Sequence, residues 1–174
     1  IYKMVENILE KIIKKKSERL TNLKKKHPIE SLKEHPLDSI DYIDFRKTIE
    51  SNISKNKISI IAEIKKASPS AGIIIENYNP VDIANIFYKN NATCLSVLTE
   101  EDFFLGSLSH IYKIKSKVDP RNPVAMHIPI LCKDFFIDPY QVRLAKYYGA
   151  DAILIILSAV TEKMANQLYE DCLL

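Results

Sequence analysis

Glycine is scarce in this 174-residue chain, which has only Gly72, Gly106 and Gly149. Dinucleotide-binding turns and P-loops each need several glycines within a few positions, so both phosphate-binding motifs are excluded. No apolar run reaches the roughly 18 residues of a membrane-spanning helix. The apolar residues near the N-terminus are interrupted by charges, unlike those of a signal peptide. We therefore expect a cytoplasmic protein with no membrane partner.

Cysteine and histidine are sparse and scattered. The cysteines, Cys94, Cys132 and Cys172, are odd in number and far apart, so they fit neither a disulfide framework nor a zinc site. We expect Cys94 and Cys132 to be small apolar core residues. The four histidines show no metal-ligand spacing, and no metal is predicted. The net charge of +3 is too small to indicate a nucleic-acid partner by itself.

From residue 58 onward, short apolar runs alternate with helical patterns. The runs are nearly continuous and rich in β-branched residues, which is typical of parallel strands covered on both faces. Strands are expected at 58–64, 94–98, 129–133 and 151–157, and helices at 80–90, 107–118, 139–148 and 161–173. Pro80 suits a first helical turn and Gly149 a helix C-cap. The alternation predicts an α/β fold with a parallel sheet.

The N-terminal part has a different pattern. Residues 2–26 are predicted to be an amphipathic helix, and a second short helix is expected over 41–51. The apolar stripe of the first helix contains Val5, Ile8, Leu9, Ile12 and Ile13. The opposite, lysine-rich face contains Lys11, Lys14, Lys15, Lys16, Lys24, Lys25 and Lys26. We therefore divide the chain into a helical extension, 1–57, and an α/β unit, 58–174.

The lysine-rich segment allows a second interpretation, a nucleic-acid-binding module. Residues 1–26 carry nine Lys or Arg against three Asp or Glu, and contacts with phosphates would give nonspecific, salt-dependent binding. However, no aromatic residues are interleaved among these charges for base stacking. The solvated face of an amphipathic helix explains the lysines more simply, so no nucleic-acid partner is predicted.

The most informative segment is 61–70, Ile-Ala-Glu-Ile-Lys-Lys-Ala-Ser-Pro-Ser. It places a carboxylate, Glu63, and an ammonium, Lys65, two positions apart in an expected strand, so the two side chains share a face. Charges on a buried face are costly unless they pair or act on a ligand. Either a structural ion pair or a functional site would explain them.

Other candidate side chains gather at the predicted strand ends, where parallel α/β folds form their sites. They are Phe103, Phe104, Lys133, Asp134, Phe135 and Leu154. Ammonium groups suit phosphate or carboxylate and phenylalanine faces suit a ring, so a small anionic substrate with an aromatic ring is expected. A lysine there suits a general acid that a glutamate orients. The alternatives are a solvated Lys133–Asp134 pair and phenylalanines that belong to the core.

Three segments of the chain, 61–72, 95–106 and 129–138, resemble indole-3-glycerol phosphate synthase of tryptophan biosynthesis. The run Pro-Ile-Leu-Cys-Lys-Asp-Phe, followed by Ile-Asp-Pro-Tyr-Gln, is the most specific. It is most similar to the enteric bacterial form that is fused to phosphoribosylanthranilate isomerase. The resemblance implies a (β/α)8 TIM barrel with an N-terminal helical extension. This chain would hold the extension and about the first four βα units.

The resemblance implies a carboxy-lyase that converts 1-(2-carboxyphenylamino)-1-deoxyribulose 5-phosphate to indole-3-glycerol phosphate, losing carbon dioxide and water without a cofactor. It implies that Lys133 is the catalytic general acid, Glu63 its partner carboxylate and Lys65 a catalytic lysine that contacts anionic groups. The residues implied to bind the substrate are Ser68, Pro69, Phe104, Phe135 and Leu154, the last three around the anthranilate ring.

The chain also departs from the family pattern. Ala71 stands where the motif has a lysine, and residues 119–127 are interpreted as an insertion. The family's second catalytic glutamate and main phosphate-binding amides lie on later strands, so these residues alone are expected to turn over substrate negligibly. A non-catalytic remnant is the alternative interpretation. Half a barrel would expose the edges of its first and fourth strands, which favours self-association.

Overall fold

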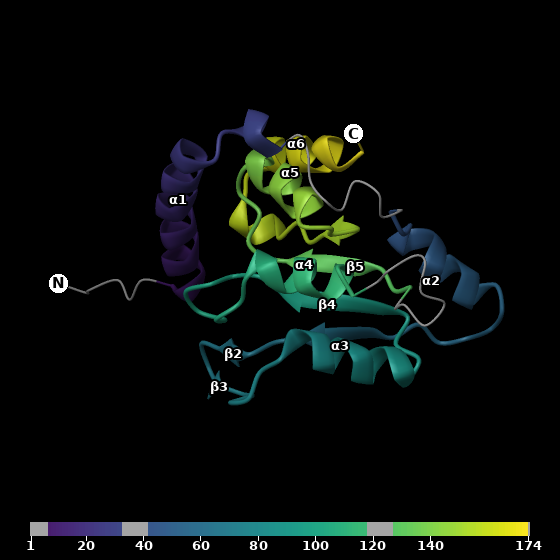
Figure 1. Ribbon diagram of the computed structural model, residues 1–174. Helices are drawn as coiled ribbons and strands as arrows, with labels where there is room; N and C mark the ends of the chain where they lie inside the picture. The colour runs from purple at the N-terminus through teal and green to yellow at the C-terminus, as the bar shows by residue number, and fades with distance from the viewer. Residues whose placement is uncertain (1–6, 33–41, 118–126, 174) are drawn as a thin grey trace.

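The computed structural model describes residues 7–32, 42–117 and 127–173 (Figure 1). Its α-helices are α1 (Ile8–Lys26), α2 (Phe45–Ile53), α3 (Pro80–Lys89), α4 (Leu108–Lys115), α5 (Pro139–Tyr147) and α6 (Glu162–Cys172). Its strands are β1 (Ile61–Ile64), β2 (Ala67–Ser68), β3 (Gly72–Ile73), β4 (Cys94–Leu98), β5 (Ile130–Lys133) and β6 (Ala152–Ile153). Short 3-10 helices span Ile29–Leu32 and Leu157–Ala159. Across these described ranges, no helix is long and apolar enough to cross a membrane.

The main sheet is parallel, with the strand order β1–β4–β5–β6. This arrangement confirms the predicted α/β class. The register aligns Glu63 with Ser96, Ser96 with Leu131, and Leu131 with Ala152, so these four positions form one row across the sheet. Within the part that the structure describes, β1 and β6 each pair along one side only.

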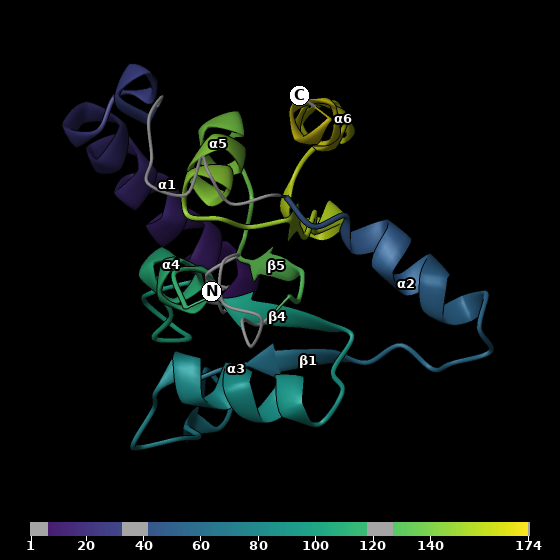
Figure 2. The same cartoon turned by 45° about the vertical axis from the view of Figure 1, so that its right-hand side comes forward.

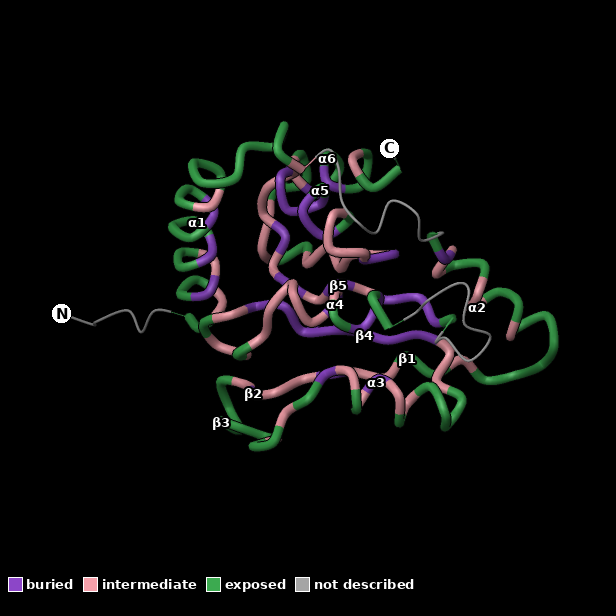
Figure 3. The backbone as a smooth tube through the Cα atoms, in the orientation of Figure 1, coloured by how far each residue is buried: buried purple, intermediate pink, exposed green. Residues whose placement is uncertain are grey.

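The core lies between the sheet and its helices. All five residues of β4 are buried, and Figure 3 shows this strand as a continuous buried stretch. Leu95 and Val97 belong to the same cluster as Ala84 of α3 and Ile111 of α4. Cys94 and Cys132 are fully buried, which confirms that they are core residues. Burial raises the pKa of the Cys94 thiol to about 11, so this thiol is protonated at neutral pH.

Two predicted strands are shorter than expected. The first begins at Ile61 instead of residue 58, and Ile58 is 87% exposed. As an edge strand, β1 pairs with β4 only, and this pairing begins at Ile61 opposite Cys94, so residues 58–60 precede the strand. The last strand spans only Ala152–Ile153, which pair with Leu131 and Cys132 of β5, and a 3-10 helix begins at Leu157. A further antiparallel hairpin, β2–β3, was not predicted.

The helix boundaries follow local capping. Pro80 occupies the first turn of α3, and α5 ends just before Gly149, which has a φ of +91°; both expectations are confirmed. Helix α2 begins at Phe45, later than predicted, because the Asp44 side chain accepts a hydrogen bond from the Lys47 amide at 2.8 Å and caps the helix there. The predicted insertion at 119–127 lies outside the described residues except for its last position.

Helix α1 confirms the predicted amphipathic helix from residue 8 onward, and positions 2–6 of the prediction lie outside the described residues. Six of the seven lysines predicted on its solvated face are exposed. Its buried side chains are Ile12, Lys16 and Leu20, each four positions apart, whereas Ile8 is 47% exposed. Lys16 was expected on the solvated face, and that expectation is wrong. Leu20 packs against Tyr140 and Leu144 of α5. Figures 1 and 2 show α1 beside the ends of β4 and β5 that lead into α4 and α5, whereas α2 lies toward the opposite ends.

The segment before α2 contacts the amino-terminal side of the sheet through Asp151. The carboxylate of Asp151 accepts hydrogen bonds from the amides of Ile43 at 3.1 Å and Ile130 at 2.7 Å. The same carboxylate pairs with the Lys115 ammonium at 2.5 Å, and both side chains are almost completely buried. The Tyr42 hydroxyl donates to the Asp151 carbonyl. The N-terminal extension is therefore attached to the α/β unit at both ends of the strands.

Candidate functional site

Glu63 lies between two lysines at the carboxyl ends of β1 and β5. Its Oε2 accepts a hydrogen bond from Lys133 Nζ, and its Oε1 is 2.9 Å from Lys65 Nζ. The sheet register explains this contact, because Glu63 is in one row with Leu131 and Lys133 follows two residues later on the same face. The structure thus brings together the three residues predicted to be catalytic.

The electrostatics of this group favour the ionised form of the Glu63 carboxyl. Burial alone would raise the pKa of the Glu63 carboxyl, but hydrogen bonds and charges from Lys133 and Lys65 outweigh burial, and the pKa is lowered. The side chains of Lys133, Glu63 and Lys65 are 37%, 29% and 33% exposed, so a ligand in solution reaches all three. One carboxylate between two ammonium groups leaves a net positive charge, which suits an anionic ligand.

Two half-buried aromatic rings lie in the loops that follow β4 and β5. The ring centroids of Phe104 and Phe135 are 6.3 Å apart, with the ring planes tilted by 38°, a separation at which aromatic rings attract each other. Phe135 follows the end of β5 by two residues, and Phe104 lies in the loop after β4. Both rings are partly exposed, so the alternative of fully buried core residues does not hold for them.

Glu100 shapes the loop that carries Phe104. It is 1% exposed and accepts hydrogen bonds from the amides of Asp102, Phe103 and Phe104, at 2.7–3.1 Å. Gly106 ends this loop close to β4, since a Cβ there would lie 2.4 Å from the Leu98 carbonyl oxygen. The sequence did not indicate this role of Glu100, because strand alternation alone does not distinguish it from its neighbour.

Asp134 is not the partner of Lys133, so the alternative of a solvated loop pair is wrong. Asp134 is buried, and its carboxylate binds Lys16 Nζ at 2.8 Å and Thr99 Oγ1 at 2.8 Å. Lys133 points instead to Glu63. Adjacent residues of β5 and its following loop project to opposite sides, which explains why the two charges have separate partners.

The other predicted binding residues take different positions. Ser68 ends β2, and its hydroxyl accepts a hydrogen bond from the Ala71 amide at 3.2 Å. Pro69 is exposed in the same turn. Leu154 directly follows β6, and continuing the β5–β6 register by one residue aligns it with Lys133. The roles of Ser68, Pro69 and Leu154 therefore stay predictions.

Several cations of the N-terminal extension are already engaged with the α/β unit. Lys16 is buried, Arg19 Nη2 binds Asp102 Oδ1 at 2.8 Å, and Lys24 Nζ binds Asp138 Oδ2 at 2.5 Å. These contacts explain part of the positive charge of the segment as intramolecular pairing. Lys16 lies four positions after Ile12 and four before Leu20. This helical spacing could have predicted that Lys16 shares the buried face.

Comparison with known proteins finds one family over most of the chain. Residues 9–173 match the family model described as "Indole-3-glycerol phosphate synthase". A protein of that name from Trichodesmium erythraeum is 39% identical over 158 residues, which cover 91% of this chain and 50% of the relative. Another from Carboxydothermus hydrogenoformans is 38% identical over 153 residues, covering 86% and 55%. "Tryptophan biosynthesis protein TrpCF" of Buchnera aphidicola subsp. Diuraphis noxia is 45% identical over 159 residues, covering 91% and 32%. The chain thus spans about half the length of the first two relatives.

Proposed function

This chain belongs to the indole-3-glycerol phosphate synthase family, and from that premise we propose that it contributes the first half of an active site for indole ring closure. The family match confirms the predicted resemblance and the predicted (β/α)8-barrel class. The proposed substrate is 1-(2-carboxyphenylamino)-1-deoxyribulose 5-phosphate and the product is indole-3-glycerol phosphate. Because the chain spans half of its relatives, we assign the activity to a barrel completed by further βα units.

The arrangement of Glu63 between Lys133 and Lys65 carries this proposal. The substrate has a carboxylate and a phosphate, and two ammonium groups in a half-exposed site provide attraction for such a molecule. The Phe104–Phe135 pair, in the loops after β4 and β5, offers apolar faces for the anthranilate ring. No metal or organic cofactor is needed for the chemistry that follows.

In the proposed reaction, the ring carbon that bears the carboxylate forms a bond with the ketone carbon, while the Lys133 ammonium protonates the ketone oxygen. The carboxylate leaves as carbon dioxide, and its electron pair restores the aromatic ring. A second proton converts the new hydroxyl to water, and one proton leaves the neighbouring methylene carbon. The net proton taken up balances the carboxylate charge, which departs as neutral carbon dioxide.

Individual residues have distinct proposed roles. Lys133 is the general acid, and Glu63 orients its ammonium through the hydrogen bond described above. Lys65 pairs with Glu63 in the absence of substrate and contacts the anionic groups of the substrate when it is bound. The pocket residues are proposed to be Ser68, Pro69, Phe104, Phe135 and Leu154. We place the boundary between the extension and the barrel at residues 57 and 58, between the end of α2 and the start of β1.

The test is turnover by a completed barrel. Residues 1–174 are joined to the remainder of the matching domain of the Buchnera relative, and product is followed by indole fluorescence. We expect turnover by the completed barrel and negligible turnover by the 174-residue chain, because preorganised groups from both halves are needed. A completed barrel that folds, as judged by circular dichroism, yet forms no product would contradict the proposed function.

We also propose that the 174-residue chain self-associates through its sheet edges. Ile60 and Ile61 are 53% and 49% exposed at the β1 edge, and unpaired edges favour pairing with another chain. Sedimentation should show species larger than the 20.0 kDa monomer. Ile61→Lys should reduce association, whereas Ile8→Lys, which adds a charge on α1 away from the edge, should not. A compact wild-type monomer at all concentrations would refute this proposal.

The proposed location of the protein is the cytoplasm. The structure shows Cys94, Cys132 and Cys172 as free thiols. Free cysteines together with a biosynthetic substrate fit a reducing compartment.

A further inference from the structure

Lys16 is a buried cation that the N-terminal extension places between two loops at the carboxyl ends of the strands. Its side chain is 5% exposed. Its Nζ lies 2.8 Å from Asp134 Oδ1 and 3.3 Å from Glu101 Oε2. Asp134 belongs to the loop after β5 and Glu101 to the loop after β4. One ammonium group therefore joins both loops to α1.

The carboxylate of Asp134 is held by three donors. Besides Lys16, it accepts hydrogen bonds from Thr99 Oγ1 at 2.8 Å and from the Phe135 amide at 2.7 Å. Asp134 stands in the chain between Lys133 and Phe135. Fixing its side chain therefore fixes the backbone from which the proposed acid and one of the two aromatic rings project.

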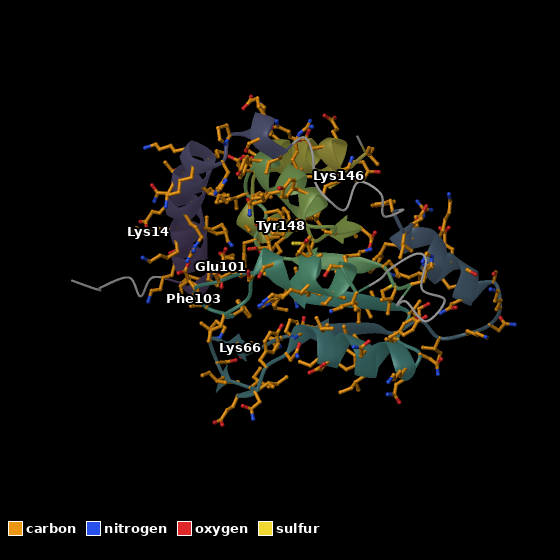
Figure 4. The ribbon with its side chains drawn as sticks, viewed as in Figure 1. Lys14, Lys66, Glu101, Phe103, Lys146 and Tyr148 are labelled. Carbon is orange, nitrogen blue, oxygen red and sulfur yellow. The ribbon has the colours of Figure 1, made fainter. Side chains whose placement is uncertain are left out.

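The contact between Lys16 and Glu101 ties the loop after β4 to α1 as well. Its neighbour Glu100 holds the loop backbone up to Phe104 through three amide hydrogen bonds. Arg19 of α1 adds contacts to Glu101 at 3.4 Å and Asp102 at 2.8 Å. Figure 4 shows Glu101 and Phe103 at the end of β4, next to α1. Both loops of the aromatic pair are thus tied to the same helix.

The ammonium of Lys16 is retained in this position by charge. Burial alone would lower the pKa of Lys16, but the carboxylates of Asp134 and Glu101 outweigh burial, and the pKa is raised. Lys16 therefore stays protonated at neutral pH. Replacing it by an apolar residue of similar size removes the charge without opening a large cavity, which makes Lys16→Met an informative change.

We propose that Lys16 is a positioning residue: it ties the Asp134 and Glu101 loops to α1 and so sets the contact between the Lys133 amine and Glu63 and the approach of Phe104 to Phe135. The inference rests on the proposed function for what the Lys133 amine does, but the positioning itself is a property of the folded chain. It gives the N-terminal extension a part in arranging the site.

The test measures the Lys133 amine directly in the 174-residue chain. Wild type and Lys16→Met are treated with trace acetic anhydride at one pH, and acetylation of Lys133 relative to exposed Lys146 is read from peptide mass spectra. We expect the ratio to rise about fivefold in Lys16→Met, because the amine loses a well-aligned hydrogen bond to Glu63. Labelling requires no substrate, so a failure of the ring-closing proposal would not alter this result.

A matched control separates positioning from general docking of the helix. Lys24→Met removes another ion pair between α1 and the α/β unit, with Asp138, and should leave the ratio unchanged. An unchanged ratio in folded Lys16→Met, or an equal rise in Lys24→Met, would overturn the proposal. If Lys16→Met does not fold, Asp134→Asn serves instead, because it weakens the pair with Lys16 from the β5 side and keeps the Lys16–Glu101 contact. A smaller rise is then expected, and no rise would be decisive against the proposal.

Discussion

Replacing Lys133 with alanine is expected to lower the ring-closing rate of a completed barrel by about 10²- to 10⁴-fold, the usual contribution of a general acid. The Lys133 ammonium is the donor that Glu63 holds at the end of β5. Without it, the oxygen of the ketone must take its proton from water, and the negative charge that develops on that oxygen is not neutralised. The effect should appear in kcat, because protonation occurs only in the transition state.

The measurement compares steady-state rates of Lys133→Ala and Lys146→Ala. Lys146 is an exposed lysine on α5 and provides a control for the loss of one positive charge. Figure 4 labels it away from Glu101 and Phe103. A Lys133→Ala barrel that keeps nearly wild-type activity would show that another group is the acid.

The second large effect concerns stability. Asp151→Ala is expected to lower the free energy of unfolding by about 3–5 kcal/mol, the range found when one partner of a buried ion pair is removed. The Lys115 ammonium, whose side chain is 3% exposed, would be left without its carboxylate. The amides of Ile43 and Ile130 would lose their acceptor as well, and the attachment of the extension beside β5 would weaken.

Urea denaturation measures the free energy of unfolding of wild type and of Asp151→Ala. The double variant Asp151→Ala/Lys115→Met should recover part of the lost stability, because it removes the uncompensated charge. Glu50→Ala, which breaks the exposed Arg46–Glu50 pair on α2, should change little. If Asp151→Ala were as stable as Glu50→Ala, the buried network would not hold the extension as described.

The charged group at the strand ends could be predicted from the sequence, because its formation depends on two regular features of the fold. The predicted strand alternation puts Glu63 and Lys65, which directly follows β1, on one face. The parallel sheet places the end of β5 on the same edge, with β4 between the two strands. The contact of Lys133 with Glu63 follows from the register. The family resemblance supplied the proposed roles of these residues, which spacing alone leaves open.

Contacts between residues far apart in the chain could not be predicted from these regular features. Lys16 looked like one more lysine of a solvated face, since its partners Glu101 and Asp134 are more than 80 positions away in sequence. The short β2–β3 hairpin has only two residue pairs, too few to produce a recognisable alternation of apolar and polar residues in the sequence. The start of β1 was misplaced because an edge strand tolerates exposed isoleucines that resemble a buried run.

The attachment of α1 has a consequence for the order in which the protein forms. The Lys24–Asp138 pair joins residues 114 positions apart. Translation produces α1 before its partners in the α/β unit, and Asp134, Asp138 and Tyr140 emerge from the ribosome only after β5 has been made. Until then the apolar side of α1, with Ile12 and Leu20, has no surface to cover it. Helix α1 therefore docks fully only after β5 and the start of α5 have been made, and until then the nascent chain presents the apolar side of an amphipathic helix that chaperones would recognise.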